Sequence, residues 1–155
     1  MSDRASIRHA TPADAEAIAS LVGELGYPST AGDVVSRLAR LNDFQAAVAF
    51  IAEIDGVVAG VVTGHVFPSI HDSANVAWLT TLVVGLRYQR RGIGKYLTDA
   101  IETWARGQGA VRVSLTSGQH RDGAHAFYRE LGYQYTGVRL TKPLVAEETP
   151  SHAAT

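Results

Sequence analysis

The sequence predicts an α/β fold in which about four helices flank a central mixed, mostly antiparallel sheet of six to seven strands. Segments with strand and helix patterns alternate in the order strand, two helices, three strands, helix, strand, helix, strand. Asp55-Gly56 joins two apolar, β-branched runs, which is a hairpin signal and makes those strands antiparallel. A chain of 155 residues with 46% hydrophobic content is long enough for one domain with its own core.

The chain starts with a short strand at residues 7–10, followed by two helices. Thr11, Pro12 and Asp14 supply an N-cap, a proline in the first turn and an acid at the third position, as is typical of a helix start. Gly26 ends this helix, and Thr30 caps the next one. Each helix has one apolar side: Ile18, Leu21, Val22 and Leu25 in the first, and Val34, Val35, Leu38 and Leu41 in the second.

The middle of the chain predicts three long strands and a helix. The strands are residues 47–54, 57–67 and 75–84, with a loop at 68–73 before the third. A helix starts at Gly92 and ends before Gly107, and its apolar face is made by Ile93, Leu97, Ile101 and Trp104.

The last part predicts a half-buried strand at 111–115, a helix that stops at Gly132 and a strand from about 135 to 141. The packing face of the helix is made by Ala124, Phe127, Tyr128 and Leu131. Residues 1–143 are therefore expected to form a single domain. Residues 144–155 are polar and small, and we expect a disordered tail.

Composition excludes several classes of function. The chain has no cysteine, so it lacks disulfides, thiolate ligands and a cysteine nucleophile. The net charge of -1 argues against nucleic acid as a partner. No leader-like or membrane-spanning run occurs, which predicts a cytoplasmic protein without a membrane partner. The six histidines lack the spacings of zinc sites, so we expect no metal.

The stretch from Gln89 to Lys95 follows an apolar strand and opens a helix. A helix start offers unpaired N–H groups to an anion, and Gly92 and Gly94 let a phosphate come close. A solvated turn with a basic rim is the alternative. Two nucleotide motifs are absent, because a P-loop requires Ser or Thr after its lysine and the dinucleotide fingerprint requires a third glycine where Leu97 stands.

Gln89-Arg90-Arg91-Gly92-Ile93-Gly94 resembles the acyl-coenzyme A loop of the GNAT superfamily of N-acetyltransferases, Gln/Arg-x-x-Gly-x-Gly/Ala. Residues 124–133 are similar to the downstream helix of that family, Ala-x-x-Phe-Tyr followed by Leu-Gly-Phe/Tyr. The resemblance covers about residues 5–143 and implies a GNAT-like fold, in which a splayed pair of strands binds the coenzyme.

The resemblance implies acetyl-CoA as co-substrate and direct attack by a primary amine in a ternary complex. The backbone of the splayed strand would bind the pantetheine arm, and the loop would bind the diphosphate. Arg121 replaces a common asparagine, and it either binds a phosphate or faces solvent. The implied coenzyme-binding residues are Leu82, Val83, Val84, Gln89, Arg90, Arg91, Gly92, Ile93, Gly94, Lys95, Arg121, Phe127 and Tyr128.

The same resemblance makes Tyr128 the general acid for the leaving sulfur, with a contribution of at most about 10²-fold. Many members carry a glutamate base on the strand before the loop, but residues 76–84 contain no carboxylate. His65 is the candidate base by residue type. A structural histidine is the alternative, and an amine with a near-neutral pKa needs no base.

The acceptor pocket is expected at residues 24–33 and 66–73, with Tyr27, His65, His71 and Thr81 as candidate contacts. These segments carry few carboxylates, which favours a small molecule or a peptide end as the acceptor. A homodimer through the last strands is a further expectation. Two other functions stay open: a non-catalytic acyl-CoA-binding regulatory or sensor domain, and a nucleotide-binding module.

Overall fold

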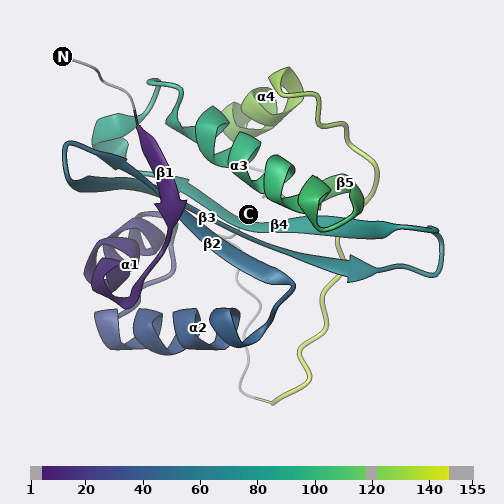
Figure 1. Ribbon diagram of the computed structural model, residues 1–155, viewed down its shortest axis with the longest axis horizontal. Helices are drawn as coiled ribbons and strands as arrows, with labels where there is room; N and C mark the ends of the chain where they lie inside the picture. The colour runs from purple at the N-terminus through teal and green to yellow at the C-terminus, as the bar shows by residue number, and fades with distance from the viewer. Residues whose placement is uncertain (1–4, 118–121, 147–155) are drawn as a thin grey trace. The chain divides into compact units, whose positions relative to one another are not determined.

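Five strands form one sheet in the first of two units, residues 1–115. They lie in chain order: β1 (Ser6–His9), β2 (Ala47–Ile54), β3 (Val57–Pro68), β4 (Asn75–Val84) and β5 (Ala110–Leu115). Neighbours are antiparallel except for β4 and β5, which are parallel. This computed structural model describes residues 5–117 and 122–146. The prediction of a mixed, mostly antiparallel sheet is confirmed (Figure 1).

The hairpin between β2 and β3 forms where the sequence predicts it. Asp55 and Gly56 have φ of 50° and 79°. Positive φ at both positions is what a type I′ turn requires, and this turn matches the twist of the two strands. The pairing of Ile54 with Val57 closes the hairpin.

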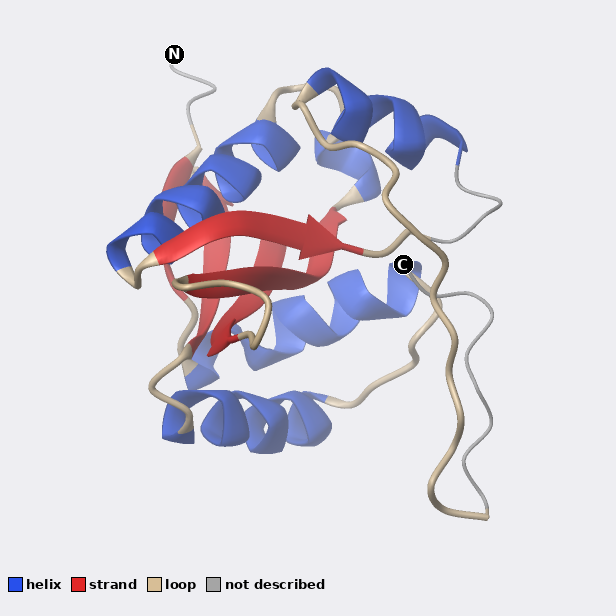
Figure 2. Ribbon diagram, turned by 90° about the vertical axis from the view of Figure 1, so that its right-hand side faces the viewer, coloured by secondary structure: helices blue, strands red, loops and turns tan. Residues whose placement is uncertain are grey.

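Three helices cover the two faces of this sheet. A 3-10 turn, η1 (Pro12–Asp14), leads into α1 (Ala15–Glu24), and α2 (Ala31–Asp43) follows. These helices lie on one face, and α3 (Ile93–Gly107) lies on the other (Figure 2). The predicted cap of α2 is confirmed, because Asp33 N donates to Thr30 Oγ1 at 3.0 Å and Thr30 N donates to the Asp33 carboxylate at 2.9 Å.

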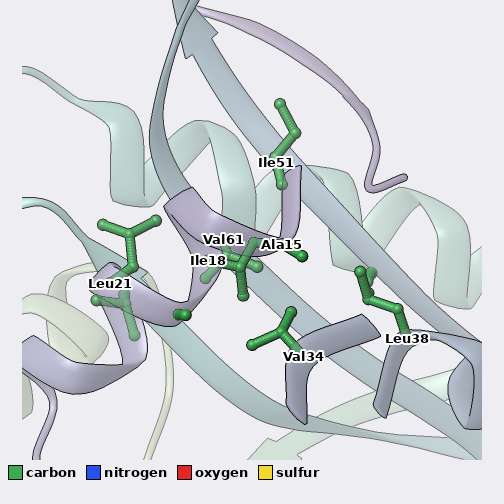
Figure 3. Close-up of a cluster of buried hydrophobic side chains, with 10 residues drawn as sticks. Ala15, Ile18, Leu21, Val34, Leu38, Ile51 and Val61 are labelled. Carbon is green, nitrogen blue, oxygen red and sulfur yellow. The ribbon is translucent and has the colours of Figure 1, made fainter. Parts of the chain in front are cut away.

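Two clusters of buried side chains hold these layers together. Figure 3 shows the first, in which α1 and α2 pack against Ile51 of β2 and Val61 of β3. The second joins α3 to the other face of the sheet. Its α3 members are Ile93, Leu97 and Ile101. The predicted inner faces of the helices are therefore confirmed, except at Val35, which is 42% exposed.

Two glycines on β3 allow α3 to approach the sheet closely. A Cβ at Gly60 would lie 2.9 Å from Leu97 Cδ1 and 2.9 Å from the Val83 carbonyl oxygen. A Cβ at Gly64 would lie 3.2 Å from Ile101 Cδ1. No larger side chain fits at Gly60 unless the helix or the strand moves.

The second unit, residues 116–155, contains α4 (Asp122–Glu130). Tyr133 N donates to the Tyr128 carbonyl at 3.0 Å, Gly132 N donates to that of Arg129 at 3.0 Å, and Gly132 has φ of 95°. These two bonds with a left-handed glycine form a Schellman motif. The rings of Tyr128 and Tyr133 lie 5.8 Å apart and supply its apolar contact. The predicted stop at Gly132 is confirmed.

One predicted strand is wrong. Residues 135–141 form neither strand nor helix, so the described residues contain five strands, where six to seven were expected. Strand propensity reflects packing on a paired neighbour, and the sequence pattern alone did not reveal whether this segment has one. A dimer through the last strands thus has no strand at 135–141 in the described structure to build on. Most of the tail predicted to be disordered, residues 147–155, lies outside the described residues.

Candidate active site

The strand β4 keeps its partner β5 along only half of its length. The parallel pairing runs from Asn75 with Ala110 to Leu79 with Leu115. Residues 81–84 pair only with β3, for example Leu82 with Val62 and Val84 with Gly60, and Thr80 has no partner in the register. Within the described part of the first unit, the other edge of residues 80–84 has no strand beside it. Unpaired backbone N–H and C=O groups on such an edge can bind an extended, amide-bearing ligand.

A β-bulge stands where this open edge begins. Thr63 pairs with Thr81 and Gly64 pairs with Leu79, so Thr80 is an extra residue in β4. A bulge bends its strand and increases the local twist, which turns β4 away from the direction of β5. The sequence reasoning missed this bulge. The sequence carries no signal that predicts the bulge, because two adjacent threonines are ordinary strand residues.

Backbone hydrogen bonds hold the start of the segment between β4 and α3 in place. Gly85 N donates to the Ala59 carbonyl at 2.8 Å, and Tyr88 N donates to Gly85 O at 2.8 Å. The latter bond belongs to the 3-10 turn η2 (Leu86–Tyr88), drawn in teal at the left of Figure 1. Glu24 at the end of α1 accepts from Leu86 N at 3.3 Å.

The loop then presents the start of α3. Arg90 has φ of 64°, and Gly92, the N-cap, has φ of 79°. No side chain caps this helix. The N–H groups of its first turn therefore remain for another acceptor, since they precede the first helical partner. Such a helix start suits a phosphate.

Side chains around the helix start add positive charge. Arg90, Arg91 and Lys95 are exposed, and the Arg91 guanidinium lies 5.7 Å from the centre of the Tyr88 ring. Gln89 Nε2 donates to the Val84 carbonyl at 3.4 Å, which links the loop to the end of β4. Ile93 is different, because its side chain is 1% exposed and belongs to the core, so only its backbone is available to a ligand.

The sheet face that carries α1 and α2 also carries several predicted acceptor residues. His65 and Phe67 of β3 alternate onto this face with Val61 and Thr63. The His65 and Phe67 rings are stacked, with centres 5.2 Å apart. Thr81 lies beside Thr63 in register. His65 and Thr81 thus share a face, and their roles stay predictions.

The structure separates the two segments predicted to form the acceptor pocket. Tyr27 lies between α1 and α2, close to the end of the molecule where Glu24 contacts Leu86. His71 lies in the turn between β3 and β4, at the opposite end of β4, which is the right-hand tip in Figure 1. Ten residues of strand span about 33 Å. Tyr27 and His71 therefore lie toward opposite ends of β4, and their roles in acceptor binding stay predictions.

All three carboxylates near these segments already have partners. Glu24 accepts from Leu86 N, and Asp33 caps α2. Asp72 forms two hydrogen bonds with Arg112, at 2.7 and 2.8 Å, which hold the pKa of its carboxyl below the ordinary value. The Thr30 N–H hydrogen bond, with a smaller contribution from its hydroxyl, lowers the pKa of Asp33. Of the three, Asp72 is paired with a cation, Arg112, whereas the hydrogen-bond donors to Glu24 and Asp33 are neutral groups that leave their negative charge in place.

The remaining predicted residues belong to the second unit. Tyr128 lies on α4, with its ring 5.2 Å from that of Phe127 in an edge-on contact. Arg121 lies outside the described residues. The roles of Tyr128 and Phe127 stay predictions.

Residues 5–117 and 122–146 contain no group of three or more histidine or acidic side chains placed to hold a metal ion. Within the same ranges, no helix has the length and apolar character needed to cross a bilayer.

An apolar groove of about 580 Å³ lies between α3 and the first two strands, away from the open edge of β4. It is lined by Ala5, Ile7, Phe50, Tyr96, Asp99, Ala100, Thr103 and Trp104.

Comparison with known sequences gives one family. Residues 20–133 match the sequence model of the acetyltransferase (GNAT) family. An aminoglycoside N(6')-acetyltransferase type 1 of Stenotrophomonas maltophilia is 33% identical over 135 residues, which cover 84% of this chain and 87% of that protein. The uncharacterized N-acetyltransferase YhdJ of Bacillus subtilis is 36% identical over 77 residues, or 49% of this chain and 54% of that protein.

Solved structures with the same fold include two acetyltransferases. The aminoglycoside N-acetyltransferase AAC(6')-Iy, in complex with CoA, superposes with a TM-score of 0.81 at 18% identity, over 92% of this chain and 96% of that one. Glucosamine-6-phosphate N-acetyltransferase from Arabidopsis thaliana gives 0.79 at 16% identity, over 92% and 99%. At these identities the likeness concerns the fold.

Proposed function

The chain belongs to the GNAT family and is an acetyltransferase, and on this basis we propose that it transfers the acetyl group of acetyl-CoA to a primary amine of a small molecule. The observation that carries the proposal is the open edge of β4 leading to an uncapped, glycine-bearing helix start. An extended amide-bearing arm fits the first feature, and a diphosphate fits the second.

The residues present fit such a coenzyme. The backbone of Leu82, Val83 and Val84 would pair with the amides of the pantetheine arm, since this edge has no other strand beside it in the described part of the first unit. The N–H groups of the first turn of α3 would bind the diphosphate. The remaining coenzyme contacts proposed are those of the loop side chains, Gln89, Arg90, Arg91 and Lys95, and of the second-unit residues Arg121, Phe127 and Tyr128.

The coenzyme supplies an acetyl thioester, an activated acyl group. The acceptor nitrogen forms the new N–C bond as the C–S bond breaks, and one N–H proton leaves to water or to a basic side chain. A backbone N–H on the open edge would stabilise the negative charge that develops on the acetyl oxygen. Tyr128 would donate a proton to the departing sulfur, and His65 is the side chain proposed to accept the amine proton.

For the acceptor, we infer a small molecule bound on the face of the sheet that carries His65 and Thr81. The aminoglycoside acetyltransferase that is 33% identical makes aminoglycosides the first class to test. The two segments expected to form the acceptor pocket carry only three carboxylates, Glu24, Asp33 and Asp72, and Arg112 already neutralises that of Asp72, which argues against an acceptor site built for many positive charges. Comparable kcat/KM values for glucosamine and for the polycation sisomicin are therefore expected.

The first experiment measures the thermal midpoint with acetyl-CoA, CoA, ATP and NAD, and then acetyl transfer as thiol release from acetyl-CoA. A ligand at 100 times its Kd stabilises a protein by about 2.7 kcal/mol, so a shift with the two CoA forms alone is expected. No shift with acetyl-CoA at millimolar concentration would contradict the proposal.

Tyr128→Phe tests the proposed acid. The variant should keep its affinity for CoA and lose rate by at most about 10²-fold, because the thiolate is already a fair leaving group. Tyr135→Phe, outside α4, is the matched control and should leave the rate unchanged. A Tyr128→Phe variant with the wild-type rate would exclude this tyrosine as the proton donor.

A further inference from the structure

Two hydroxyl groups meet at the bulge of β4. Thr63 Oγ1 of β3 and Thr80 Oγ1 of β4 lie 2.7 Å apart. Thr80 is exposed, whereas Thr63 is partly buried. In a bonded hydroxyl pair one O–H is used within the pair, so the second O–H and the remaining lone pairs are free to bind a ligand.

The bulge gives Thr80 this position. In a regular strand, residues 79, 80 and 81 would alternate between the two faces of the sheet. Because Thr80 is the extra residue, Leu79 still packs on the α3 side, while Thr80 and Thr81 both lie on the side of Thr63. The extra residue thus adds a hydroxyl to the face that carries His65.

The pair also stands at the inner end of the open edge of β4. Leu79 is the last residue of β4 that pairs with β5, and Thr80 is the next residue. Val84 lies four positions after Thr80, which is about 13 Å of strand. An extended arm that starts at the diphosphate site on α3 and follows this edge would end near Thr80. Its terminal thioester would then lie beside the two hydroxyls.

From this placement we propose that the Thr63–Thr80 pair binds the amino group of the acceptor. Thr80 Oγ1 accepts a hydrogen bond from an N–H of the amine and so directs the nitrogen toward the thioester. Thr63 acts as a positioning residue, because its hydroxyl holds the rotamer of Thr80. Neither hydroxyl is basic enough to take the proton, which leaves to water or to His65. This inference rests on the proposed function and adds an acceptor-binding site to it.

The experiment replaces each hydroxyl by a methyl group of the same shape. Thr80→Val, Thr63→Val and the double variant are assayed with sisomicin, glucosamine and n-butylamine as acceptors. Each single variant should raise the acceptor KM about fivefold, the effect of one lost hydrogen bond, while the KM for acetyl-CoA stays unchanged. The double variant should be no worse than Thr80→Val, because the two residues act as a unit.

Two further variants complete the test. Thr80→Ser keeps the hydroxyl and should retain the wild-type acceptor KM. Thr103→Val makes the same chemical change on the exposed side of α3 and should change neither constant. All variants are compared with wild type by thermal midpoint, so that a folding defect is recognised separately from a binding defect.

The outcomes separate this inference from the proposed function. If wild type acetylates none of the three amines, the proposed function fails and the inference fails with it. If wild type is active and Thr80→Val keeps the wild-type acceptor KM, only the inference is overturned. It is also overturned if the KM for acetyl-CoA rises in place of the acceptor KM, or if Thr80→Ser is as defective as Thr80→Val.

Discussion

At the scale of single residues, Gly92 connects the conformation of the chain to the proposed binding of the coenzyme. Its φ of 79° is left-handed, and a Cβ at this position would have no neighbour nearer than Tyr96 Cε2 at 3.9 Å. The glycine is therefore required by the backbone conformation and not by crowding within the protein, and close approach of the proposed diphosphate would be a second reason for it. The loop motif has a glycine at this position, and the positive φ of Gly92 explains why a glycine is needed there.

Gly92→Ala should lower the free energy of unfolding by about 1 kcal/mol, because alanine is strained at positive φ. The Kd for acetyl-CoA should also rise, because the methyl group crowds the anion. Chemical denaturation and calorimetry of coenzyme binding measure the two effects. Gly23→Ala is the matched control, since Gly23 lies in α1 with open space around it. It should stabilise the protein by up to about 1 kcal/mol and leave coenzyme binding unchanged.

At the scale of elements, the packing of α3 against β3 sets the distance between this helix and the sheet. The first turn of the same helix is the proposed binding site for the diphosphate of the coenzyme. Leu97 is fully buried and meets the sheet at Gly60, where backbone and side chain leave no room for a methyl group. The start of α3 is thus positioned by packing about one turn further along the helix.

Gly60→Ala should lower the free energy of unfolding by about 1–3 kcal/mol, as overpacked cores do. Its Cβ would lie only 2.9 Å from Leu97 Cδ1 and from a carbonyl oxygen of β4. Gly32→Ala on α2 is the control, because its nearest contact is Thr30 Oγ1 at an ordinary 3.7 Å. Urea denaturation compares the two. Equal stability of both variants would show that a methyl group fits between α3 and β3 at Gly60.

Several elements could be predicted because their signals are local. The Asp55-Gly56 turn, the Thr30 cap and the stop at Gly132 all rest on backbone preferences within a few residues. The strand predicted at 135–141 rested on composition alone, and it is wrong because a strand also requires a partner. The bulge at Thr80 was missed for the same reason, since it exists only in the register between β3 and β4.

At the scale of the whole molecule, one ion pair joins the start of the sheet to the first helical turn. Asp14 is 6% exposed and accepts two hydrogen bonds from Arg8, at 2.9 and 2.8 Å, and one from Thr11 N at 2.8 Å. Arg8 also binds Glu53 on β2. The hydrogen bonds from Arg8 hold the pKa of Asp14 below its ordinary value, with a smaller contribution from the Thr11 N–H.

This pKa shift predicts a loss of stability in acid. A carboxyl whose folded-state pKa lies below its unfolded value stabilises the fold above that unfolded value, about 3.9 for aspartate. The stabilisation is lost as the pH falls from there through the folded-state pKa. Asp14→Asn should therefore lower the free energy of unfolding at pH 7 by about 1–3 kcal/mol, and by less at pH 3. Urea denaturation at both values measures the difference.

Asp99→Asn, at an exposed position on α3, is the control for this substitution. It should leave the stability at pH 7 within about 0.5 kcal/mol of wild type. If Asp14→Asn destabilised the protein equally at pH 3 and pH 7, packing of the side chain and not its charge would explain the effect.

The family, the order of the elements as far as α4 and the glycine-bearing loop before α3 could all be read from the sequence, because hydrophobic periodicity, caps and glycine turns act over a few residues. Which surfaces those residues share followed from the tertiary structure. It ended the β4–β5 pairing at Leu79, brought Thr80 beside Thr63 and engaged Asp72 with Arg112. These contacts join residues 17 to 40 positions apart, and strand register and packing, which no local pattern encodes, bring them together.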